Sequence, residues 1–146
     1  MRVLVAIDDS KFSQEAVRAV AKQIRPEGAE VRVLHVLQPI ALSPVPQMDA
    51  RYAPELEAQA KEAKELVSRA ADALRGSGFR VETAIEKGDI RLEIIDSAAE
   101  WKADLIVVGS HGRTGLPRLV LGSVAEFVAR NAACSVQIVR TSNPKK

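Results

Sequence analysis

Residues 2–10 read RVLVAIDDS, a short and mainly apolar run that ends in two aspartates and a serine. The run lacks the alternation of polar and apolar residues that marks a strand with one face in water. It is typical of a strand covered on both faces, as in parallel sheets flanked by helices. A second run of this kind, DLIVV, occupies residues 104–108. Together the two runs predict a parallel α/β fold.

The rest of the chain alternates β-rich runs with helical patterns. Further strands are predicted at 30–37 (EVRVLHVL), 79–86 (FRVETAIE) and 135–140 (SVQIVR), and helices at 12–25, 55–75, from Gly88-Asp89 to about 101, and after a glycine-rich loop. Asp89 is a natural N-cap. Because strand–helix–strand crossovers are right-handed in about 98% of cases, we expect a three-layer, doubly wound sheet of five parallel strands. One domain should cover residues 1–146.

The segment 38–54 interrupts this pattern with four prolines and little periodicity. We expect it to be a surface loop that serves as a lid, an interaction segment or an irregular excursion, because it is longer than most connections. In the helix that follows, one stripe of residues recurs at helical spacing and should be buried. The stripe comprises Leu56, Ala60, Ala63, Val67, Ala70 and Leu74.

Composition narrows the classes of protein. The 146 residues carry a net charge of +2 with scattered basic side chains, which argues against a nucleic-acid surface. No apolar run approaches the roughly 20 residues that cross a bilayer, and the N-terminus becomes acidic too early for a signal peptide. Cys134 is the only cysteine, so no disulfide can form within the chain. We expect a cytoplasmic protein that contacts neither membrane nor nucleic acid.

The densest chemical signal follows the run DLIVV. Gly109, Gly112 and Gly115 lie in a short loop, and successive N–H groups of such a loop can form an anion-binding concavity. Further on, Ser123-x-x-Glu126 matches a capping box and predicts a helix N-terminus at Gly122-Ser123, where phosphate is favoured. Arg113 adds a cation. These features predict phosphate binding; the alternative is that the glycines make turns and the serine caps a helix.

The spacing Gly109-x2-Gly112-x9-Gly122-Ser123 resembles the nucleotide motif of the ATP-binding universal stress proteins. The resemblance covers the whole chain, from VLVAIDDS at 3–10 through VLHVL at 33–37 to the final strand. It implies an adenine nucleotide alpha hydrolase-like, Rossmann-like fold that binds ATP, with Mg or Mn as the accompanying ion. It also implies a homodimer that pairs through the edge of the last strand, Val136 to Arg140.

The resemblance assigns roles to individual positions. It puts the base and ribose at Ala6 and Asp8, adenine recognition at the backbone of Val36, the ribose and phosphates along Gly109, Ser110, His111, Gly112, Arg113, Thr114 and Gly115, and the phosphates under Gly122, Ser123, Val124 and Ala125. The sequence departs from the family where Ala125 replaces a frequent hydroxyl residue, and where Ala133 and Ser135 replace prolines. These departures imply one phosphate contact fewer and a different entry to the last strand.

Three side chains have alternative interpretations. The Asp8 carboxylate can accept hydrogen bonds from ribose hydroxyls or help to hold a divalent ion, and it can instead cap the following helix with Asp9 and Ser10. His111 can approach a phosphate or be an exposed turn histidine. His35 is expected to be a core or boundary residue of its strand.

Other nucleotide folds do not fit the sequence. It has no GxGxxG after the first strand and no GxxxxGK[ST]. Asp8-Asp9 resembles the acidic pair of a response-regulator receiver, but DLIVV ends in Gly109-Ser110 rather than a phosphoacceptor aspartate. No general base stands beside Gly122-Ser123, so we expect a nucleotide-responsive stress or regulatory protein with at most slow hydrolysis. The alternative is a dimeric interaction module with an empty or vestigial pocket.

Overall fold

Five parallel strands form one sheet in the order β3-β2-β1-β4-β5. The structure is a computed structural model that describes residues 1–39, 48–111 and 120–141, with the backbone alone for 48–53. The elements are β1 (Arg2–Ala6), α1 (Lys11–Gln23), β2 (Glu30–Leu37), α2 (Met48–Gly76), β3 (Arg80–Lys87), α3 (Ile90–Trp101), β4 (Leu105–Gly109), α4 (Ser123–Asn131) and β5 (Ser135–Val139). The predicted fold class and strand order along the chain are confirmed.

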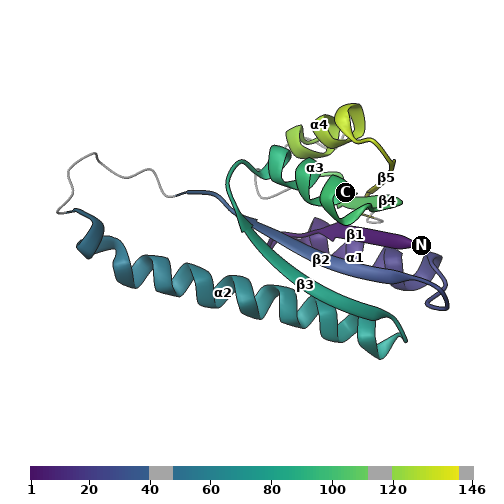
Figure 1. The fold of residues 1–146 in the computed structure, drawn as a ribbon, viewed down its shortest axis with the longest axis horizontal. Helices are drawn as coiled ribbons and strands as arrows, with labels where there is room; N and C mark the ends of the chain where they lie inside the picture. Colours follow the sequence, from purple (N-terminus) through teal and green to yellow (C-terminus); the bar gives the residue numbers. More distant parts are fainter. Residues whose placement is uncertain (40–47, 112–119, 142–146) are drawn as a thin grey trace.

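The chain reverses its direction across the sheet at β1. It first moves outward from β1 to β3, then crosses back to lay β4 on the other side of β1. As a result α1 and α2 cover one face of the sheet, while α3 and α4 cover the other (Figure 1). Segments that leave β1 and β4 diverge at such a switch point and open a crevice at the carboxyl ends of the strands.

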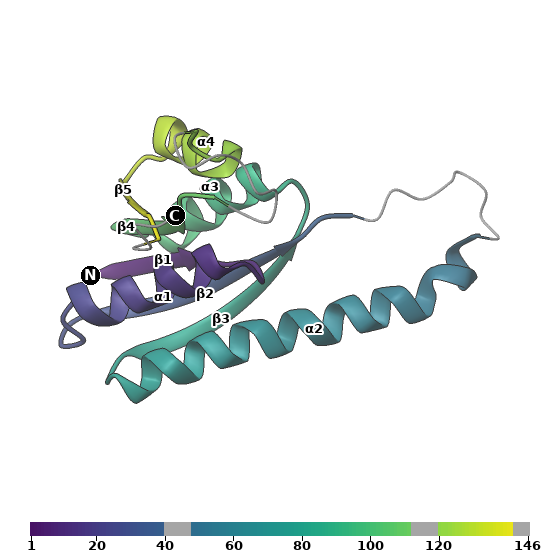
Figure 2. The ribbon, with the colours of Figure 1, turned by 180° about the vertical axis from the view of Figure 1, so that it is seen from behind.

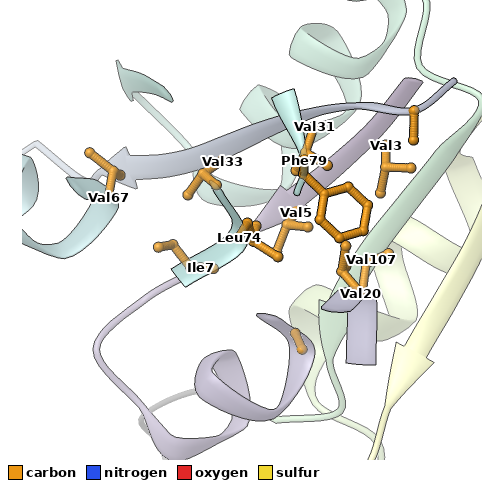
Figure 3. Close-up of a cluster of buried hydrophobic side chains, with 12 residues drawn as sticks. Val3, Val5, Ile7, Val20, Val31, Val33, Val67, Leu74, Phe79 and Val107 are labelled. Atoms are coloured by element: carbon orange, nitrogen blue, oxygen red, sulfur yellow. The ribbon is translucent and has the colours of Figure 1, made fainter. Parts of the chain in front are cut away.

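Each face of the central strands has its own core. Val3, Val5 and Ile7 point toward α1 and α2, and Leu4 points toward α3 and α4. Figure 3 shows the first of these clusters, in which Phe79 packs close to the β-strand valines. Burial on both faces is the reason why residues 2–7 have no polar alternation.

The helix α2 differs from its prediction at both its start and its buried stripe. It begins at Met48 and includes Pro54, so the predicted loop 38–54 is wrong over its last seven positions, while residues 40–47 lie outside the described part. A proline is tolerated without cost only in the first turn of a helix, and Pro54 is the seventh residue of α2. The helix therefore forms in spite of Pro54, and the flanking Met, Ala and Arg residues, which are strong helix formers, favour it.

Burial along α2 starts only at Ala63. Leu56 is 42% exposed and Ala60 is also exposed, whereas Ala63, Val67 and Leu74 are buried as predicted. The reason is visible in Figures 1 and 2, where the first part of α2 extends past the end of the sheet and has no strand beneath it. The apolar spacing alone does not reveal where the sheet ends.

The helix α3 begins at the predicted cap. The Asp89 carboxylate accepts hydrogen bonds from the N–H groups of Arg91 and Leu92 at 3.0 and 3.2 Å. These bonds, that of Leu92 foremost, lower the pKa of Asp89 below its ordinary value.

Among the described residues, no helix combines the length and the apolar character that crossing a bilayer requires.

Candidate nucleotide site

A cavity of about 660 Å³ lies at the carboxyl ends of β1, β2 and β4. Nine of the predicted site residues line it, namely Ala6, Asp8, Val36, Gly109, His111, Gly122, Ser123, Val124 and Ala125. Ser110 is buried beside the cavity and is not part of its lining. Gly112, Arg113, Thr114 and Gly115 fall outside the described residues. The fold thus brings residues from both ends of the sequence motif to one site.

The Asp8 carboxylate lies in the turn between β1 and α1. Its Oδ1 accepts hydrogen bonds from the Ser10 backbone N–H at 2.8 Å and from the Ser13 hydroxyl at 2.9 Å. Ser10 is the N-cap of α1. The Ser10 Oγ accepts from the Ser13 N–H at 3.3 Å, so Ser10 caps the helix and Asp8 holds the capping residues in place. Both bonds to the Asp8 carboxylate use one of its oxygens, and Asp8 also lines the cavity.

Ser13 is a site residue that the sequence analysis missed. It is buried and lines the cavity, and its Oγ accepts a hydrogen bond of 2.7 Å from the backbone N–H of Asp8. Ser13 is the third residue of α1, the position from which a capping-box side chain reaches back past the cap. The spacing Ser10-x-x-Ser13 was the available signal, although a capping box normally has Glu or Gln there.

The main chain of Val36 faces the space beyond the end of β1. The N–H and C=O of a strand residue point to the same side, and successive residues alternate between the two neighbouring strands. The Leu34 carbonyl accepts from the Ile7 N–H at 2.9 Å, on the β1 side, and the Leu37 carbonyl accepts from Gly88 on the β3 side. The peptide groups of Val36 therefore point to the β1 side, past the last register pair of β1 and β2.

One wall of the cavity is apolar. It is built from the α3 and α4 face of the sheet and from the start of α3, and these side chains belong to the second core cluster. The wall includes Ala6, Leu34, Val36, Val108, Ile90, Ile94 and Ala125. Such a surface suits a flat heterocycle, since it offers contact area without hydrogen-bonding competition.

Gly109 and Gly122 are required by close packing rather than by unusual backbone angles. A Cβ atom on Gly109 would lie 2.8 Å from the Phe12 Cβ and 2.9 Å from its carbonyl oxygen. A Cβ atom on Gly122 would lie 2.9 Å from the Ser110 carbonyl oxygen, to which the Gly122 N–H donates. Gly109 thus lets the end of β4 lie against α1, and Gly122 lets the start of α4 lie against the residues that follow β4.

His111 ties the two sides of the glycine-rich segment together. Its Nε2 donates to the carbonyl of Val120, because a carbonyl can only accept, and its Nδ1 lies 3.0 Å from the Ser110 Oγ. The ring also packs against Phe12, with centroids 5.1 Å apart. Both ring nitrogens thus contact the protein, and the histidine fastens the residue after β4 to the segment before α4.

The N-terminus of α4 opens into the cavity without a capping side chain. Gly122 is the N-cap, and no side chain caps the helix. The predicted capping box is therefore wrong: Ser123 is the first helical residue, and the Glu126 N–H donates to the Gly122 carbonyl. The Gly122 N–H donates to the Ser110 carbonyl, and Gly122 takes the cap position, so the helix starts one residue earlier than the box requires. The predicted helix N-terminus at Gly122-Ser123 is confirmed.

The helix α2 supplies a polar wall that sequence analysis did not assign. Gln59, Glu62, Ala63, Glu65, Leu66 and Arg69 line the cavity from one side of the helix. Together with Asp8 and Asp9, the described lining holds four carboxylates, against the single guanidinium of Arg69 and two histidines. Of these residues only Ala63 belongs to the apolar stripe that helical spacing predicts, and the cavity beside α2 is seen only in the fold.

Metal ligands are sparse in the described residues. They contain no group of three or more His, Cys, Asp or Glu side chains arranged to hold a metal ion. Asp8 and Asp9 are the carboxylates of the β1 turn. Mg²⁺ commonly uses one or two carboxylates together with substrate phosphates and water. The donor set therefore fits a metal ion that arrives with a phosphate ligand.

Comparison with known proteins gives a consistent family assignment. A family model described as "Universal stress protein family" matches residues 1–140. A universal stress protein of Methanocaldococcus jannaschii is 34% identical over 147 aligned positions, which cover 99% of this chain and 84% of the relative.

Solved structures agree with this assignment. A universal stress protein from Lactobacillus plantarum superposes with a TM-score of 0.85 at 27% identity, covering 96% of this chain and 97% of the other. A universal stress protein in complex with cAMP superposes with a TM-score of 0.70 at 27% identity, covering 97% of this chain and 98% of the other. One from Archaeoglobus fulgidus in complex with dAMP gives 0.68 at 28% identity, with coverage of 95% and 97%.

Proposed function

The chain belongs to the universal stress protein family, and from this premise we propose that it binds an adenine nucleotide, ATP in particular, at the ends of β1, β2 and β4. The observation that carries the proposal is the pairing of two features in one cavity. An apolar wall with the peptide groups of Val36 and the uncapped N-terminus of α4 line the same cavity.

The adenine end of the proposed site follows from β2. A peptide N–H and C=O on the same side of a strand match the neighbouring donor and acceptor on the edge of an adenine ring. Val36 presents such a pair beyond the end of β1, and its own side chain packs into the apolar wall. In this arrangement the base lies along the wall formed with Ile90 and Ile94.

The phosphate end of the proposed site follows from α4. The first N–H groups of a helix have no partner within the helix, and the helix dipole favours an anion there. Here these groups belong to Ser123, Val124 and Ala125, which all line the cavity. Because Gly122 has no side chain, no cap competes with a phosphate for them.

The charge of the lining supports a role for a divalent ion. Four carboxylates and one guanidinium line the described cavity, so a polyphosphate would enter a site of net negative charge. Mg²⁺ or Mn²⁺ carried by the phosphates offsets this repulsion in a cavity that two carboxylates of the β1 turn, Asp8 and Asp9, also line. We expect ATP affinity to fall much more than AMP affinity when divalent ions are removed with a chelator.

The proposed role is regulatory. Both ring nitrogens of His111, the histidine that precedes α4, contact the protein, which argues against this residue as a general base beside the N-terminus of α4. We expect at most slow hydrolysis of ATP. Bound nucleotide would instead alter the loops around the cavity and the surfaces that partner proteins contact, in the cytoplasm of a stressed cell.

A second candidate function follows from the edge of the sheet. β5 pairs with β4 on one side only, and Val136, Ile138 and Val139 are half-buried in the single chain. An edge strand of this kind pairs readily with a second copy. We propose a homodimer through β5. The same dimer is expected under the alternative function, an interaction module with a vestigial pocket. Sedimentation as a monomer at micromolar concentration would contradict the dimer.

The test is a search for bound nucleotide followed by titration. Freshly purified protein is denatured and any released nucleotide identified by mass, and the stripped protein is then titrated with ATP and Mg²⁺. Ser123→Ala and Asp8→Asn should weaken binding, because both side chains line the cavity. Ser68→Ala and Asp72→Asn, at exposed positions of α2 outside the cavity, are the matched controls. Absence of binding at millimolar ATP would reject the proposal in favour of the interaction module.

A further inference from the structure

The side chain of His35 makes a contact to which the proposed function assigns no role. His35 lies on β2, is half-buried and lines the cavity. Its Nδ1 is 2.7 Å from the carbonyl oxygen of Ile7, the first residue after β1. Since a carbonyl only accepts, Nδ1 carries the hydrogen and donates. The ring therefore links β2 to the chain at the point where it leaves the sheet for Asp8.

The Ile7–Asp8 peptide group is fastened at both ends. Its carbonyl oxygen accepts from His35, and its N–H, which belongs to Asp8, donates to the Ser13 Oγ at 2.7 Å. The preceding N–H of Ile7 donates to the Leu34 carbonyl at 2.9 Å. Because a peptide group is planar, holding both of its polar atoms fixes the direction in which the Cα–Cβ bond of Asp8 leaves the chain.

The same network sets the rotation of the Asp8 side chain. Its Oδ1 accepts from Ser10 and Ser13, which leaves Oδ2 as the oxygen available to a ligand. We propose that His35 is a positioning residue that holds the Asp8 carboxylate in place to accept hydrogen bonds from the ribose hydroxyls of a bound nucleotide. This inference rests on the proposed function, since it requires an adenine nucleotide in the cavity.

The chemistry of position 35 allows a conservative replacement. The Nδ2 of asparagine is attached to Cγ, as the Nδ1 of histidine is, so His35→Asn keeps a donor at the same distance along the side chain. His35→Leu keeps apolar bulk and removes the donor. A residue that acted only by filling space would tolerate leucine better than asparagine, because an amide costs more to bury than leucine.

The experiment compares two ligands that differ only in the ribose. AMP and 2′,3′-dideoxyadenosine 5′-monophosphate are titrated calorimetrically into the wild type, Asp8→Ala, His35→Leu and His35→Asn. Val33→Ala is the matched control, since Val33 is a buried residue of the same strand that does not line the cavity. Thermal unfolding of each variant sets a temperature at which all of them are folded.

We expect the wild type to prefer AMP by about tenfold or more, as hydrogen bonds to a charged group allow. This preference should vanish in Asp8→Ala and shrink several-fold in His35→Leu. It should be retained in His35→Asn and in the control Val33→Ala. A purely structural role would weaken both ligands equally and leave their ratio unchanged.

The outcomes separate the two proposals. If the wild type binds neither ligand, the proposed function fails and this inference fails with it. If it binds both equally, or if His35→Leu keeps the full preference that Asp8→Ala loses, adenine nucleotide binding stands and the role of His35 is wrong.

Discussion

At the scale of single residues, close packing rather than backbone freedom explains why two positions of the motif require glycine. Gly109 and Gly122 have ordinary backbone angles, yet each lies so close to neighbouring main chain that a methyl group has no space. The motif contains both positions, and both line the cavity. The spacing of the motif does not supply this reason, because the contact joins segments that only the fold brings together.

Replacement of Gly122 should therefore destabilise the fold itself. We expect Gly122→Ala to lower the free energy of unfolding by about 1–3 kcal/mol, as overpacking against main chain does. Gly76→Ala is the control, since nothing lies within 4 Å of its added Cβ, and it should be neutral or stabilising by up to about 1 kcal/mol. Urea unfolding followed by circular dichroism measures both variants, and equal losses would contradict the packing argument.

Asp89 should make stability depend on acid pH. The backbone N–H of Leu92, with Arg91, holds the pKa of this carboxyl below its ordinary value. A depressed folded-state pKa contributes stability that is present above the unfolded pKa and is lost as the pH falls through the folded one. Urea midpoints measured from about pH 6 to about pH 2 should fall less steeply in Asp89→Asn than in the wild type. A slope in Asp89→Asn as steep as that of the wild type would contradict this account of the cap.

At the scale of elements, the strands were predicted to within one or two residues and α2 was not. The apolar runs are bounded by charged residues or glycine, and burial on both faces makes them unmistakable, as with residues 2–7. The start of α2 was missed because Pro54 was taken as a boundary. Its exposed first turns were missed because Leu56 and Ala60 continue the apolar spacing beyond the sheet.

Two leucine-to-alanine substitutions on α2 test whether its first turns are exposed and its later turns buried. Leu74→Ala removes a side chain that is 1% exposed, and we expect a loss of about 2–5 kcal/mol of unfolding free energy. Leu56→Ala removes one that is 42% exposed, and its effect should stay within about 0.5 kcal/mol. Chemical denaturation of the two variants gives the comparison. A large loss for Leu56→Ala would mean that a partner surface covers the first turns of α2.

At the scale of the whole molecule, the candidate site was predicted in its sequence-local parts only. Residues in the turn after β1 and at the start of α4 could be identified from the printed motif. The α2 wall, Ser13 and His35 were assigned no site role, because their role depends on which elements the crossovers bring side by side. The direction of the Val36 peptide groups is also a property of the sheet order, since it depends on β1 being shorter than β2.

The single thiol offers a measure of global unfolding. Cys134 is half-buried at the start of β5, and burial, reinforced by the charge of Asp104, raises its pKa. The thiolate is therefore scarcer in native protein than in unfolded protein, so alkylation by iodoacetamide at neutral pH should be slower in native protein than in urea. Equal rates would mean that β5 separates from the sheet without global unfolding.

The lining of the cavity begins at Ala6 and ends at Ala125. A ribosome must therefore synthesise most of the chain before the last wall, the start of α4, exists. A small molecule in the cell can occupy the cavity of a completed protein, but it cannot guide the folding of the half that emerges first. The early βα units must find their arrangement from their own packing.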